Sequence, residues 1–173
     1  EPWALIDTDR YPIATDGSRR DEVVAAVRVA LADVGCAVLP GFLSAVGVRE
    51  LLAEAAEREP RAFYNPVNKA NVHLGDADPS RPADHPRNRF FARTNGFVRA
   101  DEWDDSTHCK RLYDWNPLKD FLQDCLGKDE LHVYEDPVSN MIVNVQRKGQ
   151  EFNWHLDTNE FTITILLQRA DEG

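Results

Sequence analysis

The chain has 173 residues, of which 42% are hydrophobic, and this length and composition predict one folded domain. Its 30 acidic residues outnumber its 20 basic ones, and the net charge of −10 argues against charge-driven binding to nucleic acid or to an anionic membrane. No apolar run approaches the roughly 18 residues that span a bilayer. The three cysteines form no C-x-x-C pair and no signal-peptide pattern is present, so we expect reduced thiols in a cytoplasmic protein.

The first part of the chain predicts two helices with a short strand between them. Apolar residues recur at helical spacing from Arg19 to Val34, and Gly35 suits the C-cap position. The apolar run Cys36–Leu39 predicts a strand. Ser44 is expected to N-cap a second helix that ends near Glu59.

The middle of the chain, residues 60–104, is rich in Pro, Asn, Asp and Arg. It is too long for an ordinary connector, so it is either functional or partly disordered, and it is the natural candidate for a lid. Within it, Arg89–Arg93 is strand-like. From Asp105 to Leu126 the pattern predicts one or two helices, with a break near Asn116 and Pro117.

After residue 130 the hydrophobic period changes from helix to strand. Four short strands are predicted in succession, at Leu131–Tyr134, Ser139–Gln146, Glu151–Asp157 and Phe161–Gln168. Residues 1–130 are thus mainly helical and residues 131–173 are β, which gives an α+β class. Four strands cannot close a barrel or an eight-stranded roll, so we expect an incomplete sheet that further protein completes.

The sequence Asn-Trp-His-Leu-Asp at 153–157 contains the strongest chemical signal. Residues i and i+2 of a strand point to the same side, so His155 and Asp157 can offer a nitrogen and an oxygen to one metal ion. They would supply two ligands of the 2-His-1-carboxylate triad that holds Fe(II). The alternative is a half-buried histidine hydrogen-bonded to its neighbour, because His-x-Asp is common by chance.

Polar residues on the neighbouring strands suggest a ligand cavity. Asn144 and Gln146 share one strand face, and Thr162 and Thr164 share another. A bound polar ligand would satisfy them, although a solvated polar face explains them equally simply. The other histidines give weaker signals, and no Gly-x-Ser-x-Gly elbow or phosphate-binding glycine loop is present.

Two stretches resemble a known family. Gly35–Leu43, set between two helices, resembles the N-terminal signature of phytanoyl-CoA-hydroxylase-like and related 2-oxoglutarate-dependent oxygenases. Asn144 through Gln168 resembles the first half of their double-stranded β-helix, and Asp171–Gly173 is similar to the approach to the following glycine-rich segment. Within the superfamily, the likeness extends to the enzymes that hydroxylate or halogenate free amino acids such as lysine.

The resemblance implies a single oxygenase domain over residues 1–173, with N-terminal helices packed on a jelly-roll or cupin-like β-helix. It implies Fe(II) and 2-oxoglutarate as cofactors, with O2 and a small molecule as substrates. His155 and Asp157 would be metal ligands, and a carboxylate at 157 implies hydroxylation, because the halogenases have glycine there. The third ligand, a distal histidine, and the arginine that grips 2-oxoglutarate are expected outside this chain, so this segment alone is expected to bind iron poorly and to be inactive.

The remaining assignments also follow from the resemblance. Asn144, Thr164 and Arg93 are the candidates for the cosubstrate pocket, although an ordinary salt-bridged arginine is the simpler explanation for Arg93. Trp154, Glu151 and Asn153 flank the metal strand and are expected to face substrate, with Glu151 pairing with a cationic amine or serving as a solvated turn residue. The alternatives are a non-catalytic cupin-like binding protein, in which His155 and Asp157 are only hydrogen-bonded, and a hydrolase that uses another metal.

Overall fold

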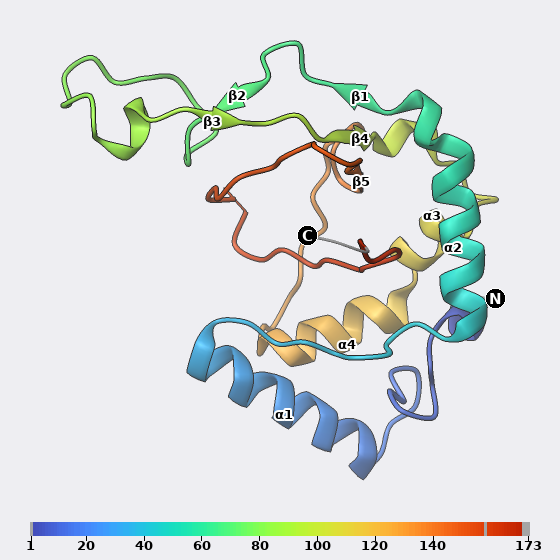
Figure 1. Cartoon of the computed structure of the whole chain (residues 1–173). Coiled ribbons are helices and arrows are strands. Elements are labelled where there is room, and N and C mark those ends of the chain that lie inside the picture. Colours follow the sequence, from blue (N-terminus) through green and yellow to red (C-terminus); the bar gives the residue numbers. More distant parts are fainter. Residues whose placement is uncertain (1, 158, 171–173) are drawn as a thin grey trace.

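The computed structural model describes residues 2–157 and 159–170, and it has a mixed architecture of helices and small sheets (Figure 1). The expected α+β class agrees with this architecture. The α-helices are α1 (Ser18–Val34), α2 (Ala45–Arg58), α3 (His108–Tyr113) and α4 (Asn116–Leu126). Short 3₁₀ helices lie at Pro2–Leu5, Glu59–Arg61, Pro86–Asn88 and Ala100–Glu102.

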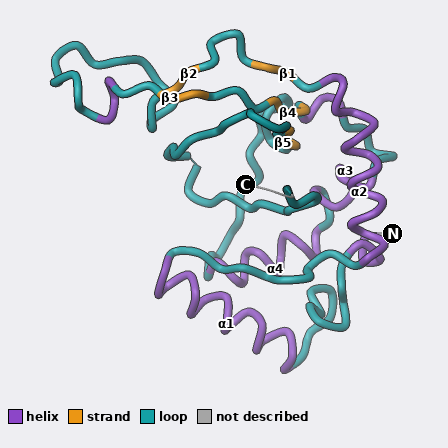
Figure 2. Tube along the Cα trace, in the orientation of Figure 1, coloured by secondary structure: helices purple, strands orange, loops and turns teal. Residues whose placement is uncertain are grey.

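The strands are short and antiparallel. They are β1 (Phe63–Tyr64), β2 (Lys69–Ala70), β3 (Phe91–Ala92), β4 (Gly96–Val98) and β5 (Val143–Val145). One sheet has the order β1-β4-β5, and β2 pairs with β3 in a second. In Figure 2 these strands are brief orange segments within long loops. The sheets of the described residues therefore do not amount to a jelly roll.

The helix boundaries agree closely with the hydrophobic periodicity. Gly35 is the C-cap of α1, and its φ of 71° lies in the left-handed region that glycine adopts without strain. The Ser44 hydroxyl caps α2 by accepting from the backbone N–H of Gly47 at 3.0 Å, and it donates to the carbonyl of Ala4 at 2.7 Å. The break predicted near Asn116 is the short gap between α3 and α4.

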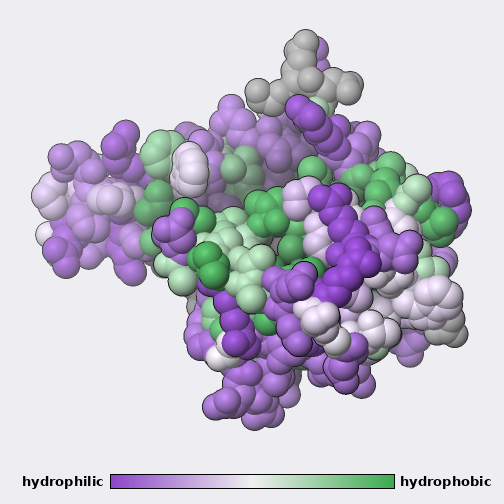
Figure 3. All heavy atoms as spheres, turned by 90° about the horizontal axis from the view of Figure 1, so that it is seen from below, coloured by the Kyte–Doolittle hydropathy of each residue, from purple (hydrophilic) through white to green (hydrophobic). Residues whose placement is uncertain are grey.

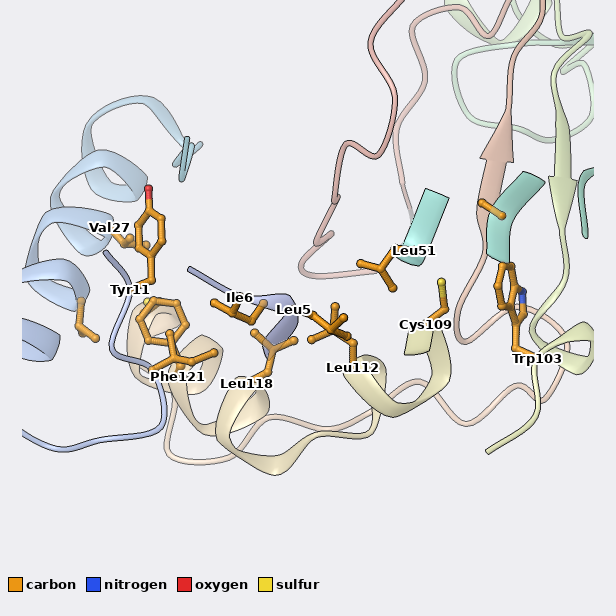
Figure 4. Close-up of a cluster of buried hydrophobic side chains, with 14 of the residues drawn as sticks. Leu5, Ile6, Tyr11, Val27, Leu51, Trp103, Cys109, Leu112, Leu118 and Phe121 are labelled. Atoms are coloured by element: carbon orange, nitrogen blue, oxygen red, sulfur yellow. The ribbon is translucent and has the colours of Figure 1, made fainter. Parts of the chain in front are cut away.

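The hydrophobic core runs along the helices as one continuous band (Figure 4). It extends from Val27 of α1 past Phe121 of α4 to Leu51 of α2, and Trp103 lies at its far end. Val98 of β4 is fully buried in the same cluster, and the half-buried Val143 and Val145 of β5 pack against it. The core thus fixes β4 and β5.

A half-buried carboxylate joins α2 to α3. Glu54 accepts from the backbone N–H groups of His108 and Cys109 at 2.7 and 3.0 Å and lies 2.8 Å from Nδ1 of His108. Burial raises the pKa of Glu54, but the hydrogen bonds from His108 and Cys109 outweigh it and hold the pKa below the ordinary value of 4.5. The negative charge sits at the N-terminus of α3, where a carboxylate is stabilising.

Several predicted strands are absent from the described residues. Of the four in the C-terminal part, the structure has a strand only within Ser139–Gln146, and Cys36–Leu39 is also irregular. Glu151–Asp157 makes a single bridge, from Phe152 to Arg93, and Phe161–Gln168 pairs with no described strand. A strand forms only when a neighbour completes its ladder, and apolar alternation alone does not supply that neighbour. Asp171–Gly173 lies outside the described residues.

The surface retains a substantial apolar component. Figure 3 shows apolar side chains exposed in patches among hydrophilic ones on the face seen from below. In the C-terminal segment, Trp154, Leu156 and Leu166 are among the exposed apolar residues. None of the helices in the described ranges combines the length and apolar character needed to cross a membrane.

Replacing Gly47 with alanine is expected to destabilise the fold, although alanine is the better helix former. A Cβ at this position would lie 2.0 Å from the carbonyl oxygen of Leu5, so α2 or the N-terminal segment must move. We expect Gly47→Ala to lower the free energy of unfolding by about 1–3 kcal/mol in urea denaturation. Gly75→Ala, where the nearest atom is 3.7 Å away, is the control and should stay within about 0.5 kcal/mol. Equal stability of the two variants would contradict the crowding at Gly47.

The Glu54 cap is expected to make stability depend on pH. Because its pKa is lowered in the folded protein, the carboxylate stabilises the fold fully above its ordinary value of 4.5 and loses this effect as the pH falls below it. Glu54→Gln should cost about 1–3 kcal/mol at neutral pH, and the difference from wild type should shrink in acid. Urea unfolding across the pH range measures this, with the exposed Glu57→Gln as control. A difference that does not change with pH would show that the charge of Glu54 is not what stabilises the contact.

Candidate functional site

The side chains of His155 and Asp157 lie next to each other, although the strand from which this was predicted is absent. Nε2 of His155 is 3.4 Å from Oδ1 of Asp157. The Nδ1 atom lies 2.8 Å from the carbonyl oxygen of Asn153, and because a carbonyl only accepts, Nδ1 carries the hydrogen. In the neutral ring the lone pair therefore belongs to Nε2, the atom that faces Asp157.

The other carboxylate oxygen of Asp157 already has a partner. The hydroxyl of Thr162 donates to Oδ2 at 2.8 Å, so Oδ1 is the oxygen that faces the imidazole. Thr162 and Thr164 were predicted to line a polar cavity, and the hydrogen bond from Thr162 to Asp157 was not predicted. The structure leaves Thr164 exposed.

The imidazole of His155 is held between neighbours that the sequence analysis missed. It stacks on the ring of Phe152, with centroids 4.0 Å apart and planes inclined by 16°. The guanidinium carbon of Arg93 lies 5.1 Å from the centre of the same Phe152 ring. Arg93, expected to contact the cosubstrate, is therefore brought close to the metal-ligand candidates through Phe152.

Residues 92–95 hold the segment that precedes His155. Thr94 donates its backbone N–H to the carbonyl of Glu151, and the N–H of Glu151 donates to the Thr94 hydroxyl, both at 2.8 Å. Asn153 donates to the carbonyl of Ala92 at 3.2 Å and to the carboxylate of Glu151 at 3.2 Å. Glu151 and Asn153, two predicted substrate residues, are therefore fixed beside each other, whereas Trp154 is 90% exposed and projects into solvent.

Asn144 lies on the outward face of β5, opposite Phe97 of β4. Its side-chain oxygen accepts from the amide of Asn95 at 3.1 Å. The oxygen of the buried Asn95 side chain has no hydrogen-bond partner among the described residues. Such an acceptor is uncommon in a folded interior, and a hydrogen-bond donor that reached it would be stabilising.

The long segment between β2 and β3 is ordered by side-chain hydrogen bonds, and its first residues contact the site. It projects from β2 and β3 (Figure 1) and is organised by Asn71, which is 1% exposed. The Asn71 amide donates to the carbonyls of Gly75 and Arg87 at 2.9 and 2.7 Å, and its oxygen accepts from the backbone of His73. The next residue, Val72, accepts at 2.7 Å from the N–H of Leu156, between the two metal-ligand candidates.

Other histidine and cysteine side chains lie away from the His155–Asp157 pair or are unsuited to nucleophilic chemistry. His108 is bound to Glu54 at the start of α3, and His132 is largely exposed. Burial raises the pKa of the Cys109 thiol to about 12 and that of the Cys125 thiol to about 11, which disfavours either of these two as a nucleophile. Surface hollows around Arg20 and Arg28, and beside Trp115, lie on other elements and contain none of the predicted site residues.

The described residues bring together two metal-ligand candidates. No group of three or more His, Cys, Asp or Glu side chains in these ranges is arranged to hold a metal ion. A comparison with protein-family models, curated proteins and solved structures finds no match for this chain. The case for a function therefore depends on the geometry of the site.

The hydrogen bonds of Asn71 are expected to stabilise the bond between the Leu156 N–H and the Val72 carbonyl. In Asn71→Ala the base of the projecting segment loses its central hydrogen bonds, so the Leu156–Val72 bond should open more often. We expect the Leu156 amide to exchange with solvent at least tenfold faster, measured by hydrogen exchange with NMR. Asn88→Ala is the control, because Asn88 bonds to the carbonyls of Asp78 and Pro82, farther out in the segment. Faster exchange in both variants, or in neither, would contradict a specific role for Asn71.

Proposed function

We propose that this chain is part of an Fe(II)- and 2-oxoglutarate-dependent oxygenase that hydroxylates an unactivated C–H bond of a small molecule, such as a free amino acid. The proposal includes a cytoplasmic location and the double-stranded β-helix as the complete fold. The antiparallel β4–β5 pair and the Arg93–Phe152 bridge are compatible with such a fold.

The observation that carries the proposal is the opposition of two acceptor atoms. With the hydrogen on Nδ1 of His155, the lone pair of Nε2 faces the carboxylate oxygen Oδ1 of Asp157 across 3.4 Å. Two lone pairs repel at this distance, and a cation that binds both atoms would remove the repulsion. A metal ion is one such cation, and a proton or a bridging water is the competing explanation.

The donor set suits the proposed metal. Donor atoms about 2.1 Å from an ion and at right angles to each other lie about 3.0 Å apart, so a separation of 3.4 Å requires only a small adjustment. The Nδ1–H bond of His155 to Asn153 and the Thr162 bond to Asp157 are the outer contacts that typically orient such ligands. A third protein ligand would come from outside the described residues.

The chain's own residues would bind and orient the other components. Arg93 is a candidate partner for a carboxylate of 2-oxoglutarate, and Asn144, with the unsatisfied Asn95 beside it, is a candidate for its polar contacts. The Glu151 carboxylate, held by Asn153, is suited to a cationic amine of the substrate. When bound, Fe(II) with 2-oxoglutarate and O2 supplies the oxidising power, and the protein positions the reactants and excludes water.

The first experiment adds Fe(II) and 2-oxoglutarate to the full-length protein without oxygen and measures the weak visible charge-transfer absorption of the ternary complex. We expect a band in wild type that is lost in His155→Ala and in Asp157→Ala, because each variant removes one metal ligand. His132→Ala, an exposed histidine, is the control and should keep the band.

The absence of a band in folded wild-type protein would refute the iron mechanism. His155 and Asp157 would then be only hydrogen-bonded, and the alternative, a non-catalytic binding protein for a small ligand, would be favoured. A band that survives in both alanine variants would place the metal elsewhere.

A further inference from the structure

The stacking of Phe152 on His155 has no role in the ligand set described above. The two rings are 4.0 Å apart and nearly parallel, with planes inclined by 16°, so no water separates them. Residues three apart in a regular strand point to opposite sides, so this stacking requires the backbone between them to leave strand geometry. The same departure brings Nδ1 of His155 to the carbonyl of Asn153, two residues earlier.

Phe152 is itself fixed in position. Its backbone pairs with Arg93, and the Arg93 guanidinium lies over its ring at 5.1 Å. No ion pair of Arg93 is found within the described residues, and its guanidinium contacts the face of the Phe152 ring. Arg93 therefore fixes the position of the Phe152 ring, and the imidazole of His155 stacks on that ring.

The two contacts of the imidazole fix complementary degrees of freedom. The Nδ1 bond sets the tautomer and the direction of one ring edge, and it still permits the ring to tilt about that bond. The flat contact with Phe152 removes the tilt. Together they leave Nε2 directed at Oδ1 of Asp157 before any metal binds. A ligand already in its bound rotamer loses less conformational entropy on binding.

We propose that Phe152 is a positioning residue for the metal-ligand candidate His155, acting by stacking on the imidazole. This inference rests on the proposed function. Phe152 contacts no metal, and its effect is on the orientation of Nε2. Outer contacts of metal-bound histidines typically change metal affinity by about 10–100-fold when they are removed.

The test compares three variants. Phe152→Leu removes the flat ring and keeps an apolar side chain, whereas Phe152→Tyr keeps the ring and should restore wild-type behaviour. Phe63→Leu removes a half-exposed aromatic ring that contacts Phe97 in the β1–β4 pair, away from His155, and controls for general loss of packing. Circular dichroism confirms that each variant folds.

The first readout needs no metal. In NMR spectra at a pH where imidazoles are neutral, the wild-type ring protons of His155 should be shifted upfield by the Phe152 ring, with nitrogen shifts of the Nδ1–H tautomer. Phe152→Leu should lose the upfield shift and keep the Nδ1–H tautomer, which the Asn153 carbonyl sets, while the nuclear Overhauser contacts between the His155 ring and Asp157 weaken because the ring is free to tilt. Phe152→Tyr and Phe63→Leu should resemble wild type.

The second readout is the dissociation constant for Co(II), an air-stable probe, from visible absorption titrations of the full-length protein. We expect Phe152→Leu to raise the constant about tenfold and the other two variants to leave it unchanged. An unchanged constant and unchanged contacts between the His155 ring and Asp157 in Phe152→Leu would overturn the positioning role and leave the proposed function standing. Wild-type protein that binds neither Co(II) nor Fe(II) would overturn the proposed function and this inference with it.

Discussion

The pairing of residues 92–95 with residues 151–153 is the contact on which the candidate site depends. Thr94 and Glu151, 57 positions apart in the sequence, exchange two hydrogen bonds, and the adjacent residues Arg93 and Phe152 form a β-bridge. Through this contact the segment that carries His155 is attached to β4, which follows residue 95 directly. Because Val98 of β4 is fully buried, the site is tied to the helical core.

The helices were predictable because their signals are local. The spacing of apolar residues, the glycine at 35 and the serine at 44 each act within a few positions, and the structure has α1 and α2 with the expected caps. His155 and Asp157 do lie next to each other, but the strand Glu151–Asp157 from which this was predicted is absent. The stack of Phe152 on His155 and the Nδ1 bond to Asn153 accompany a different backbone course. Such contacts leave no periodic pattern in a sequence.

The structure of residues 60–104 also depends on contacts that leave no pattern in the sequence. Its composition predicts a loop that is either functional or partly disordered, and composition does not separate these two outcomes. Asn71 and Asn88 organise it by bonding to carbonyls up to 16 and 10 residues away, respectively. An asparagine in a polar loop is too common to signal this role. The consequence for the site, a bond from Leu156 to Val72, becomes visible only when the whole fold is known.

The carboxylate of Asp157 limits what a bound metal would experience. One oxygen accepts from Thr162 and the other faces His155, which favours binding through a single oxygen. If Asp157 bound a metal through one oxygen and His155 bound it through Nε2, the other positions would stay open to further donors. If both oxygens bound the metal, one of those positions would be lost. The Thr162 hydrogen bond would therefore favour single-oxygen binding of a metal, and without a metal it satisfies the same carboxylate oxygen in a structural His–Asp pair.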